Sequence, residues 1–358
     1  PTSTDSTATS TRGIAGGAYP AAPVVRASCP YHRVMLRWKR LLLYGTLGVI
    51  VGLAVTIYLP WYAIGPGPAR AVQPLIRFED RTRYESEGRF VMTSVRYTRL
   101  TGFDILLAWL DPDRAVVARS VLYPEGEDVL EKRERSISQM DSSKLDASVV
   151  VLAALTGYPK EHGDGVLVES VVPGCAADGE LFPGDRIVSI DGEPIDRYRD
   201  ASRAIEAAPS GSTLTFDLTV DGEPETVDLV REPCGDIEEP LVGIRMINSF
   251  PFDVSISSGE IGGPSAGLMW ALGLYDLLTS GDLTGGRTIA GTGVIALDGA
   301  VSPIDGIEEK LTAAADAGAS VFLVPEGNEE AARASGDHGL ELVPVATFDE
   351  ALAYLGAR

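Results

Sequence analysis

The longest apolar run lies near the start of the chain. Residues 41–64 carry no charged side chain across 24 positions, and about 20 apolar residues suffice for a helix to cross a bilayer. Trp38 precedes the run and Trp61-Tyr62 lie near its end, where aromatic side chains favour the membrane–water interface. The pattern predicts a single membrane-spanning helix over residues 41–64, followed by a Gly/Pro linker at residues 65–68.

Basic residues before this run predict its orientation. Six of them stand against a single acid, Asp5: Arg12, Arg26, Arg33, Arg37, Lys39 and Arg40. The positive-inside rule then predicts that residues 1–40 form a cytoplasmic tail, disordered in its Ser/Thr/Gly/Pro-rich part, and that the rest lies outside the cytoplasm. A cleaved signal peptide is the alternative, with Ala69-Arg70-Ala71 as a loose cleavage site. The long apolar run and the charged leader favour an uncleaved anchor in the cell membrane.

Downstream, strand-like and helix-like patterns are mixed. Alternation predicts a strand over residues 89–97, and an apolar periodic stretch predicts a helix over residues 142–155. A β-rich unit follows, with strands at 165–172, 213–220 and 225–229, a strand between two turns within 181–192, and a short helix at 198–207. From residue 241 onward, strands and helices alternate: a strand at 252–257, a helix to 278, a hairpin over 288–304 and a helix ending near Gly318. The predicted fold class is α+β.

The helix that ends at residue 278 has a distinctive beginning. Its sequence is apolar on nearly all sides, which indicates burial, and Pro264 suits a first helical turn. Ser265 then lies where free backbone N–H groups and the helix dipole attract negative charge. Such an arrangement can act as an oxyanion hole beside a serine nucleophile.

A serine nucleophile needs a base, and the sequence offers few. Beyond the predicted membrane span the only histidines are His162 and His338, and neither lies in a site-like sequence. Lys310 falls on the apolar face of its predicted helix, together with Ile307, Leu311 and Ala314. Burial lowers a lysine pKa, which makes the amine a usable base near neutral pH. Asp305 and Glu308 predict a capping box at the start of this helix.

These residues carry a family resemblance. Pro264-Ser265-Ala266-Gly267 opening a buried helix, then DGAVSPIDGIEEK and VFLVPEGN, resemble the proteolytic domain of Lon proteases, with a Ser-Lys dyad in a ribosomal-protein-type α/β fold. The resemblance implies Ser265 as nucleophile, Lys310 as base, Thr292 as a residue that holds the amine, and N–H groups around Gly263 and Ser265 as oxyanion hole. Lon proteases usually have acids where this chain has Gly262 and Val294.

The β-rich unit resembles a second family. LFPGDRIVSIDG at its centre is similar to PDZ domains of the bacterial protease-associated type, over residues 160–232. The resemblance implies a peptide that adds a strand, its carboxylate held by backbone N–H groups. It places the carboxylate loop at Gly163-Asp164-Gly165 and the pairing strand at Val166, Leu167 and Val168. A domain used only for packing is the alternative.

The predicted plan is a PDZ domain inserted in a Lon-like domain. Residues 72–158 would form the N-terminal part of that domain, residues 160–232 the PDZ domain and residues 236–358 the main proteolytic part. The whole plan, anchor included, resembles bacterial PDZ-containing Lon-type membrane proteases.

Composition limits the partners and the chemistry. The formal charge is −21, and becomes −26 without the basic tail, which disfavours nucleic acid. No CxxC or HExxH is present and no Lys follows a Gly, so we expect no metal, no cofactor and no Walker A motif. Cys175 and Cys234 could pair in an oxidising compartment, which the sequence leaves open. After residue 160 the chain has nine Arg but one Lys, Lys310.

The sequence therefore predicts a membrane-anchored, ATP-independent serine endopeptidase. Its partners would be protein or peptide substrates, unfolded or near the membrane outside the cytoplasm. A homo-oligomeric ring is implied by the resemblance alone. A catalytically inactive scaffold that binds peptides is one alternative. Nucleotide binding is another, because some small-molecule kinases share this fold.

Overall fold

The computed structural model describes residues 30–108, 110, 115–123 and 129–356. The chain divides into two compact units, Pro1–Thr56 and Ile57–Arg358. In the first unit the described residues form helix α1 (Pro30–Thr56). Residues 30–40, predicted to belong to a disordered tail, are thus helical, whereas residues 1–29 lie outside the described part.

Helix α1 ends earlier than the apolar run. Its Arg37–Thr56 stretch is long and apolar enough to cross a membrane. Residues 57–64, predicted as the last part of the span, leave the helix, and strand β1 (Tyr58–Pro66) buries Tyr62 and Ala63 in the second unit. Pro60 accounts for the early end, because a proline has no N–H to bond to the carbonyl four residues earlier, which is that of Thr56. The predicted boundary at residue 64 is therefore wrong.

A five-stranded sheet forms the centre of the second unit. Its order is β2-β4-β16-β19-β20, and the last four strands run parallel. The bounds are β2 (Arg70–Ala71), β4 (Arg89–Met92), β16 (Thr288–Gly291), β19 (Val321–Pro325) and β20 (Glu341–Val345). Because β4 pairs with β16, sequence from both sides of the β-rich unit builds one sheet.

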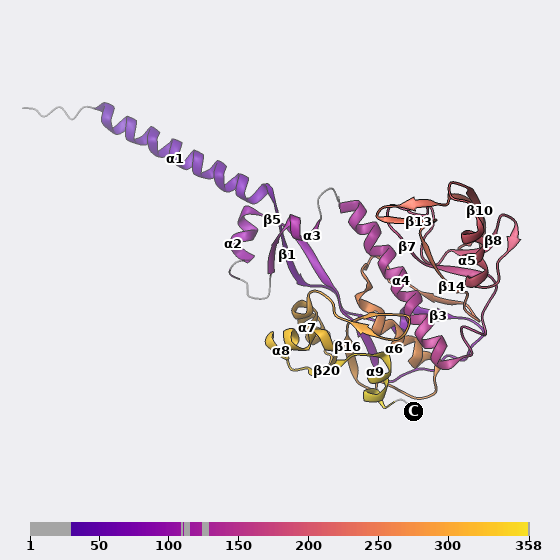
Figure 1. Ribbon diagram of the computed structural model, residues 1–358. Coiled ribbons are helices and arrows are strands. Elements are labelled where there is room, and N and C mark those ends of the chain that lie inside the picture. The colour runs from indigo at the N-terminus through magenta and orange to yellow at the C-terminus, as the bar shows by residue number, and fades with distance from the viewer. Residues whose placement is uncertain (1–29, 109, 111–114, 124–128, 357–358) are drawn as a thin grey trace, which may run out of the picture. The chain divides into compact units, whose positions relative to one another are not determined.

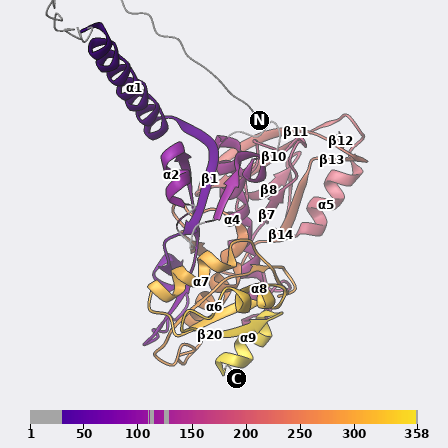
Figure 2. The ribbon, with the colours of Figure 1, turned by 90° about the vertical axis from the view of Figure 1, so that its left-hand side faces the viewer.

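Helices cover both faces of this sheet (Figure 1). Side chains alternate along its strands, so that Phe90 and Met92 enter one core and Val91 the other. The first core holds the buried α6 (Gly267–Leu278), α4 (Val129–Leu155) and α9 (Phe348–Leu355). The second holds α7 (Ile307–Asp316) and α8 (Glu329–Ala334). Figure 2 shows α9 close to the C-terminal end of the chain.

Short elements complete this core. Two small ribbons pair β3 with β15 and β17 with β18. Their bounds, with those of the single-turn helices, are β3 (Ile76–Phe78), β15 (Val254–Ile256), β17 (Val294–Ile295), β18 (Val301–Ser302), η1 (Gln73–Leu75), η2 (Pro264–Ala266) and η3 (Glu326–Asn328). The hairpin predicted over residues 288–304 is thus limited to β17 and β18, because β16 joins the parallel sheet.

A separate three-stranded sheet follows the end of α1. Its order is β5-β1-β6, with β5 (Val95–Thr101) and β6 (Ala115–Ala118) antiparallel to β1. The short helices α2 (Gly102–Ala108) and α3 (Arg119–Leu122) belong to the same part. The single strand predicted over residues 89–97 is divided between β4 and β5, which lie in different sheets.

The β-rich unit forms its own sheet, in the order β11-β10-β8-β7-β14. The bounds are β7 (Val166–Val171), β8 (Arg186–Ile190), β9 (Glu193–Pro194), β10 (Thr213–Val220), β11 (Glu223–Val230) and β14 (Ile244–Asn248), with helix α5 (Tyr198–Ala207). Figure 1 labels α5 among these strands. The predicted strands and the short helix are present, but β14 extends the sheet beyond residue 232, where the domain was predicted to end.

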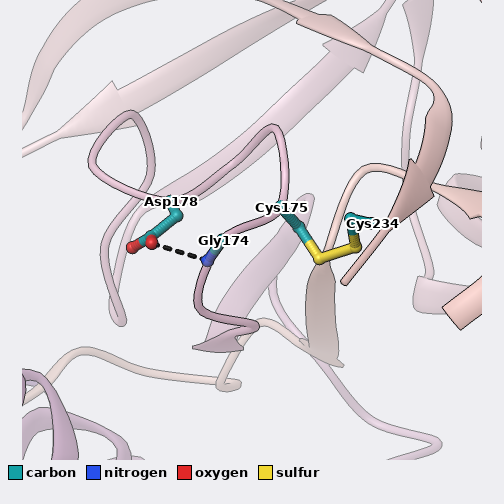
Figure 3. The surroundings of a disulfide bond; sticks show 4 residues. All are labelled: Gly174, Cys175, Asp178 and Cys234. Carbon is teal, nitrogen blue, oxygen red and sulfur yellow. Dashed lines mark hydrogen bonds between the residues drawn. A yellow bond between two sulfur atoms is a disulfide. The ribbon is translucent and has the colours of Figure 1, made fainter. Parts of the chain in front are cut away.

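A disulfide joins the segment that follows β7 to the segment that follows β11. Cys175, after β7, is bonded to Cys234 in the ribbon of β12 (Glu232–Cys234) and β13 (Ile237–Leu241). Figure 3 shows the bond, and beside it Asp178 accepting a 2.7 Å hydrogen bond from the N–H of Gly174. The pairing that the sequence left open is therefore made in this structure.

Candidate active site

Ser265 lies in the single turn η2, directly before the buried helix α6. Gly263 precedes this turn with a φ of 91°, a left-handed conformation that a glycine adopts without strain. Pro264 fits the first turn, where its missing N–H costs no hydrogen bond. Local sequence thus presents the serine at the N-terminal end of α6.

Helix α4 holds the segment before Ser265 in place. The hydroxyl of Ser143 donates to the carbonyl oxygen of Pro264 at 2.9 Å, and the Gly263 N–H donates to the Ser136 carbonyl at 2.6 Å. A Cβ at Gly262 would lie 2.8 Å from the Cβ of Ser136. The close approach of α4 therefore requires glycine where Lon proteases usually have an acid.

This contact changes the predicted role of Gly263. Its N–H was expected to face a developing oxyanion, but in this structure it is bonded to Ser136 instead. A backbone donor already paired must exchange its partner before it can stabilise substrate charge. As α6 begins two residues beyond Ser265, the positive end of its dipole still lies beside the hydroxyl.

Lys310 reaches Ser265 from helix α7. The lysine is 2% exposed, and its Nζ lies 2.7 Å from Oγ of Ser265 and donates to Oγ1 of Thr292 at 2.9 Å. Thr292 in turn donates to the Ser265 carbonyl at 2.9 Å. With one N–H of a neutral amine directed at Thr292, its lone pair can face the serine hydroxyl. The structure thus brings together three residues that are spread over 45 positions of the sequence.

The surroundings favour the neutral amine. Burial lowers the pKa of Lys310 to about 7, and the carboxylate of Asp305 opposes this by raising it. Asp305 was predicted to cap α7, but the residue before α7 is Gly306, with a φ of 72° and no side-chain cap. The loop turns through Gly306, and the charge of Asp305 instead acts on the lysine.

Ser265 and Lys310 open into a cavity of about 940 Å³. Its walls come from residues 92–97, the first half of α4, the loop at 260–264 and residues 303–305. Besides Lys310, four basic side chains line it, Arg70, Arg96, Lys132 and Arg133, against the acids Glu260 and Asp305. The cavity is thus locally cationic in an acidic chain, and neither His162 nor His338 lines it.

The predicted peptide-binding strand has no open edge. Strand β7, which contains Val166, Leu167 and Val168, pairs with β8 on one side and with β14 on the other. In the predicted carboxylate loop, Gly163 donates its N–H to the Ser249 carbonyl, and Gly165 accepts from the Ser249 N–H. An added strand cannot pair here, so the prediction is wrong about the edge.

Strand β14 is one of the two edge strands of this sheet, β11 being the other, and it is the one that pairs with β7. It ends the sheet, and helix α5 lies beside it, where the N–H of Tyr198 donates to Asn248 Oδ1 at 2.9 Å. The turn before β14 contains Gly243 at a φ of 88°, where a Cβ would lie 2.2 Å from the Cβ of Cys175. The run of β-formers Ile244, Met246 and Ile247 after a glycine was the signal that could have identified this strand.

Helix α4 also contacts the β-rich unit. Asp146 of α4 lies near Glu169 of β7, which pairs with Arg245 of β14 at 3.2 Å. Burial, followed by the charge of Glu169, raises the pKa of Asp146 to about 7. One helix therefore touches both the Ser265 segment and the strand next to β14.

Comparison with known proteins agrees with these features. Residues 252–355 match the family model described as the Lon protease (S16) C-terminal proteolytic domain, and residues 167–219 match that of the PDZ domain. The chain is 34% identical over 290 residues to the Lon protease of Rickettsia bellii, covering 69% of this chain and 36% of that protein. It is 34% identical over 123 residues to Lon protease 2 of Bacillus subtilis, covering 33% of this chain and 22% of that protein.

The chain spans about a third or less of the length of these relatives. Among solved structures, the PDZ domain of an SdrC-like protein from Listeria monocytogenes is 26% identical, with a TM-score of 0.22, over 24% of this chain and 88% of that one. The resemblance predicted from the sequence is confirmed for both domains, as is the mixed helix-and-strand fold class.

Proposed function

We propose that this chain, which contains a Lon-type proteolytic domain and a PDZ domain, is a membrane-anchored serine endopeptidase that uses Ser265 and Lys310. The observation that carries the proposal is the 2.7 Å contact between Nζ of a buried lysine and Oγ of a serine at the start of a helix. A buried amine with a pKa near neutrality is suited to act as a general base.

The geometry supports a two-step reaction. Neutral Lys310 takes the proton of Ser265 as Oγ attacks the peptide carbonyl carbon, and the ammonium then protonates the leaving amine. An ester between Ser265 and the acyl part remains. Water, deprotonated by the same amine, hydrolyses that ester and restores the hydroxyl. Thr292 acts as a positioning residue, because it bonds to both the amine and the Ser265 backbone.

The oxyanion of each tetrahedral intermediate needs backbone donors. We propose the N–H groups of Ser265 and Gly263, of which the second must first leave the Ser136 carbonyl. Substrate entering the cavity would displace the loop at 260–264 from α4. The site would then be completed by the substrate itself.

We propose that α1 anchors the chain and that substrates are segments that are already unfolded. The Arg37–Thr56 stretch is apolar enough to span a bilayer, and basic residues precede it. No Lys follows a Gly in this sequence, so we expect cleavage without ATP. Assembly into a homo-oligomer remains an expectation from the resemblance.

The test of the proposed chemistry is labelling and cleavage by the full chain in detergent. A fluorophosphonate probe should modify wild-type protein, and casein should be cut without added nucleotide. Ser265→Ala should lose both, whereas Ser335→Ala, on the C-terminal side of α8, should retain both. Labelling of the Ser265→Ala protein at the wild-type level would refute the nucleophile, and an unlabelled wild type would favour the inactive scaffold.

For the PDZ domain we propose peptide binding along β14 rather than β7. The free sheet edge beside α5 supports this assignment. A peptide with a free C-terminal carboxylate should bind the Ser265→Ala chain more tightly than its C-terminal amide, as measured by fluorescence anisotropy. Equal affinity for the two forms would contradict capture of a carboxylate.

A further inference from the structure

The short helix α2 exposes an apolar face. Phe103, Leu106, Leu107 and Leu110 are 47%, 56%, 48% and 70% exposed. Phe103, Leu106 and Leu107 lie at i, i+3 and i+4 of α2 and so on one side of it, and Leu110 lies two residues beyond its end. The opposite side already packs inward, because Ala108 is buried and Ile105 contacts the small core of Ala63 and Leu100. The exposed face is therefore additional to the one that holds α2 in place.

Chain continuity places this face near the end of α1. Tyr58, two residues after the end of α1, is paired across the sheet with Thr101, and α2 begins at the next residue, Gly102. Paired residues in antiparallel strands lie roughly 5 Å apart, and seven helical residues extend about 10 Å. Wherever the second unit lies, α2 therefore stays within a short distance of the point where α1 ends.

The surrounding residues suit a lipid headgroup region. Tyr58 and Trp61 of β1 are 58% and 42% exposed, and aromatic side chains of this kind favour the membrane interface. In the described parts of this sheet and its helices, the basic residues Arg96, Arg99 and Arg119 outnumber the single acid Asp104. Arg99 lies over the Tyr58 ring at 5.5 Å.

We propose that α2 lies in the outer headgroup layer of the membrane that α1 spans, with Phe103, Leu106, Leu107 and Leu110 inserted among the lipids. This inference rests on the proposed anchoring by α1. The partner is a lipid surface rather than a second copy of the chain, because chain continuity keeps this face close to the end of the proposed membrane span. Docking would hold the second unit at the bilayer, so that its substrates are membrane-proximal segments.

The test is lipid quenching of fluorophores on the full chain in nanodiscs of phosphatidylcholine and phosphatidylglycerol, one chain per disc. Cys29→Ser provides the background, because Cys175 and Cys234 are bonded to each other. A single label is placed at Leu107→Cys, at Leu47→Cys in α1, or at Phe182→Cys. Phe182 is the matched control, as an apolar residue 57% exposed in the PDZ domain. Lipids carry a spin label at the headgroup or within the acyl chain.

Quenching at Leu47 and Leu107, but not at Phe182, is the expected result. Adding Leu106→Glu and Leu110→Glu should reduce quenching at Leu107 to the Phe182 level, while circular dichroism shows the fold unchanged. Quenching at Leu47 without quenching at Leu107 would overturn the α2 inference and leave the anchor standing. Absence of quenching at both would overturn the two together. Quenching at Leu107 that survives the glutamates would also overturn the proposed insertion.

Discussion

Replacing Lys310 by arginine should reduce peptide cleavage by about 10²–10⁴-fold, the usual contribution of a general base. Arginine keeps the positive charge and a long side chain, but its pKa is above about 12, so it cannot accept the Ser265 proton. The lysine is 2% exposed and contacts Oγ of Ser265 at 2.7 Å, so the substitution acts at the reacting atoms. The measurement is kcat/KM for a fluorogenic peptide.

Lys144→Arg is the matched control for this experiment. Lys144 lies on α4 and pairs with Asp141 at 2.7 Å, so the same substitution there leaves the contact between Lys310 and Ser265 intact. It should retain cleavage near the wild-type level. Full activity of Lys310→Arg, with Lys144→Arg also active, would rule out the lysine as base.

The cleavage rate should depend strongly on pH on the acid side of neutrality. Only the neutral amine can take a proton, and burial places the pKa of Lys310 at about 7. Below that pH the neutral fraction falls tenfold for each unit, so kcat/KM at pH 5 should be about 100-fold below its plateau. Above pH 8 the rate should be level until other groups titrate.

Asp305→Asn distinguishes Lys310 from other groups in this profile. The Asp305 carboxylate raises the lysine pKa, so removing its charge should lower that pKa and move the acid limb to lower pH. Asp146 also has a pKa of about 7, so Asp146→Asn is the control, and it should leave the midpoint unchanged. A midpoint that moved with Asp146 and not with Asp305 would assign the titration to α4.

The sequence singled out Ser265 and Lys310 from local patterns, and the structure brings their side chains within 2.7 Å of each other. Helical periodicity alone turns Lys310 inward, and a proline followed by an apolar helix alone places Ser265 at a helix start. Although α6 and α7 pack on opposite faces of the central sheet, Lys310 reaches Ser265 at the N-terminal end of α6. After residue 160 the chain has nine Arg and one Lys, Lys310. Because arginine cannot lose its proton to act as a base, this single lysine also drew attention to position 310.

The errors concern pairings between distant segments. Whether β7 has an open edge depends on β14, which lies more than seventy residues later in the chain. The Gly263 N–H is taken by Ser136, a residue on a helix that begins before the PDZ domain. Nothing in the sequence near Gly263 indicates this partner. The end of α1 is a different case. Pro60 is a local signal for an early end, but the predicted boundary followed the length of the apolar run instead.

The insertion of one sheet within another affects the order in which the chain can fold as it is synthesised. The PDZ sheet is complete once β14 (Ile244–Asn248) exists, whereas the central parallel sheet must wait for β20 (Glu341–Val345), about 100 residues later. Strand β4 and helix α4 are made early but lack their partners during that interval. A folded PDZ domain would then shorten the effective loop between β4 and β16, because its two ends are held close by the pairing of β7 with β14. The folded PDZ domain would thus lower the entropy cost of bringing β4 and β16 together in the central sheet.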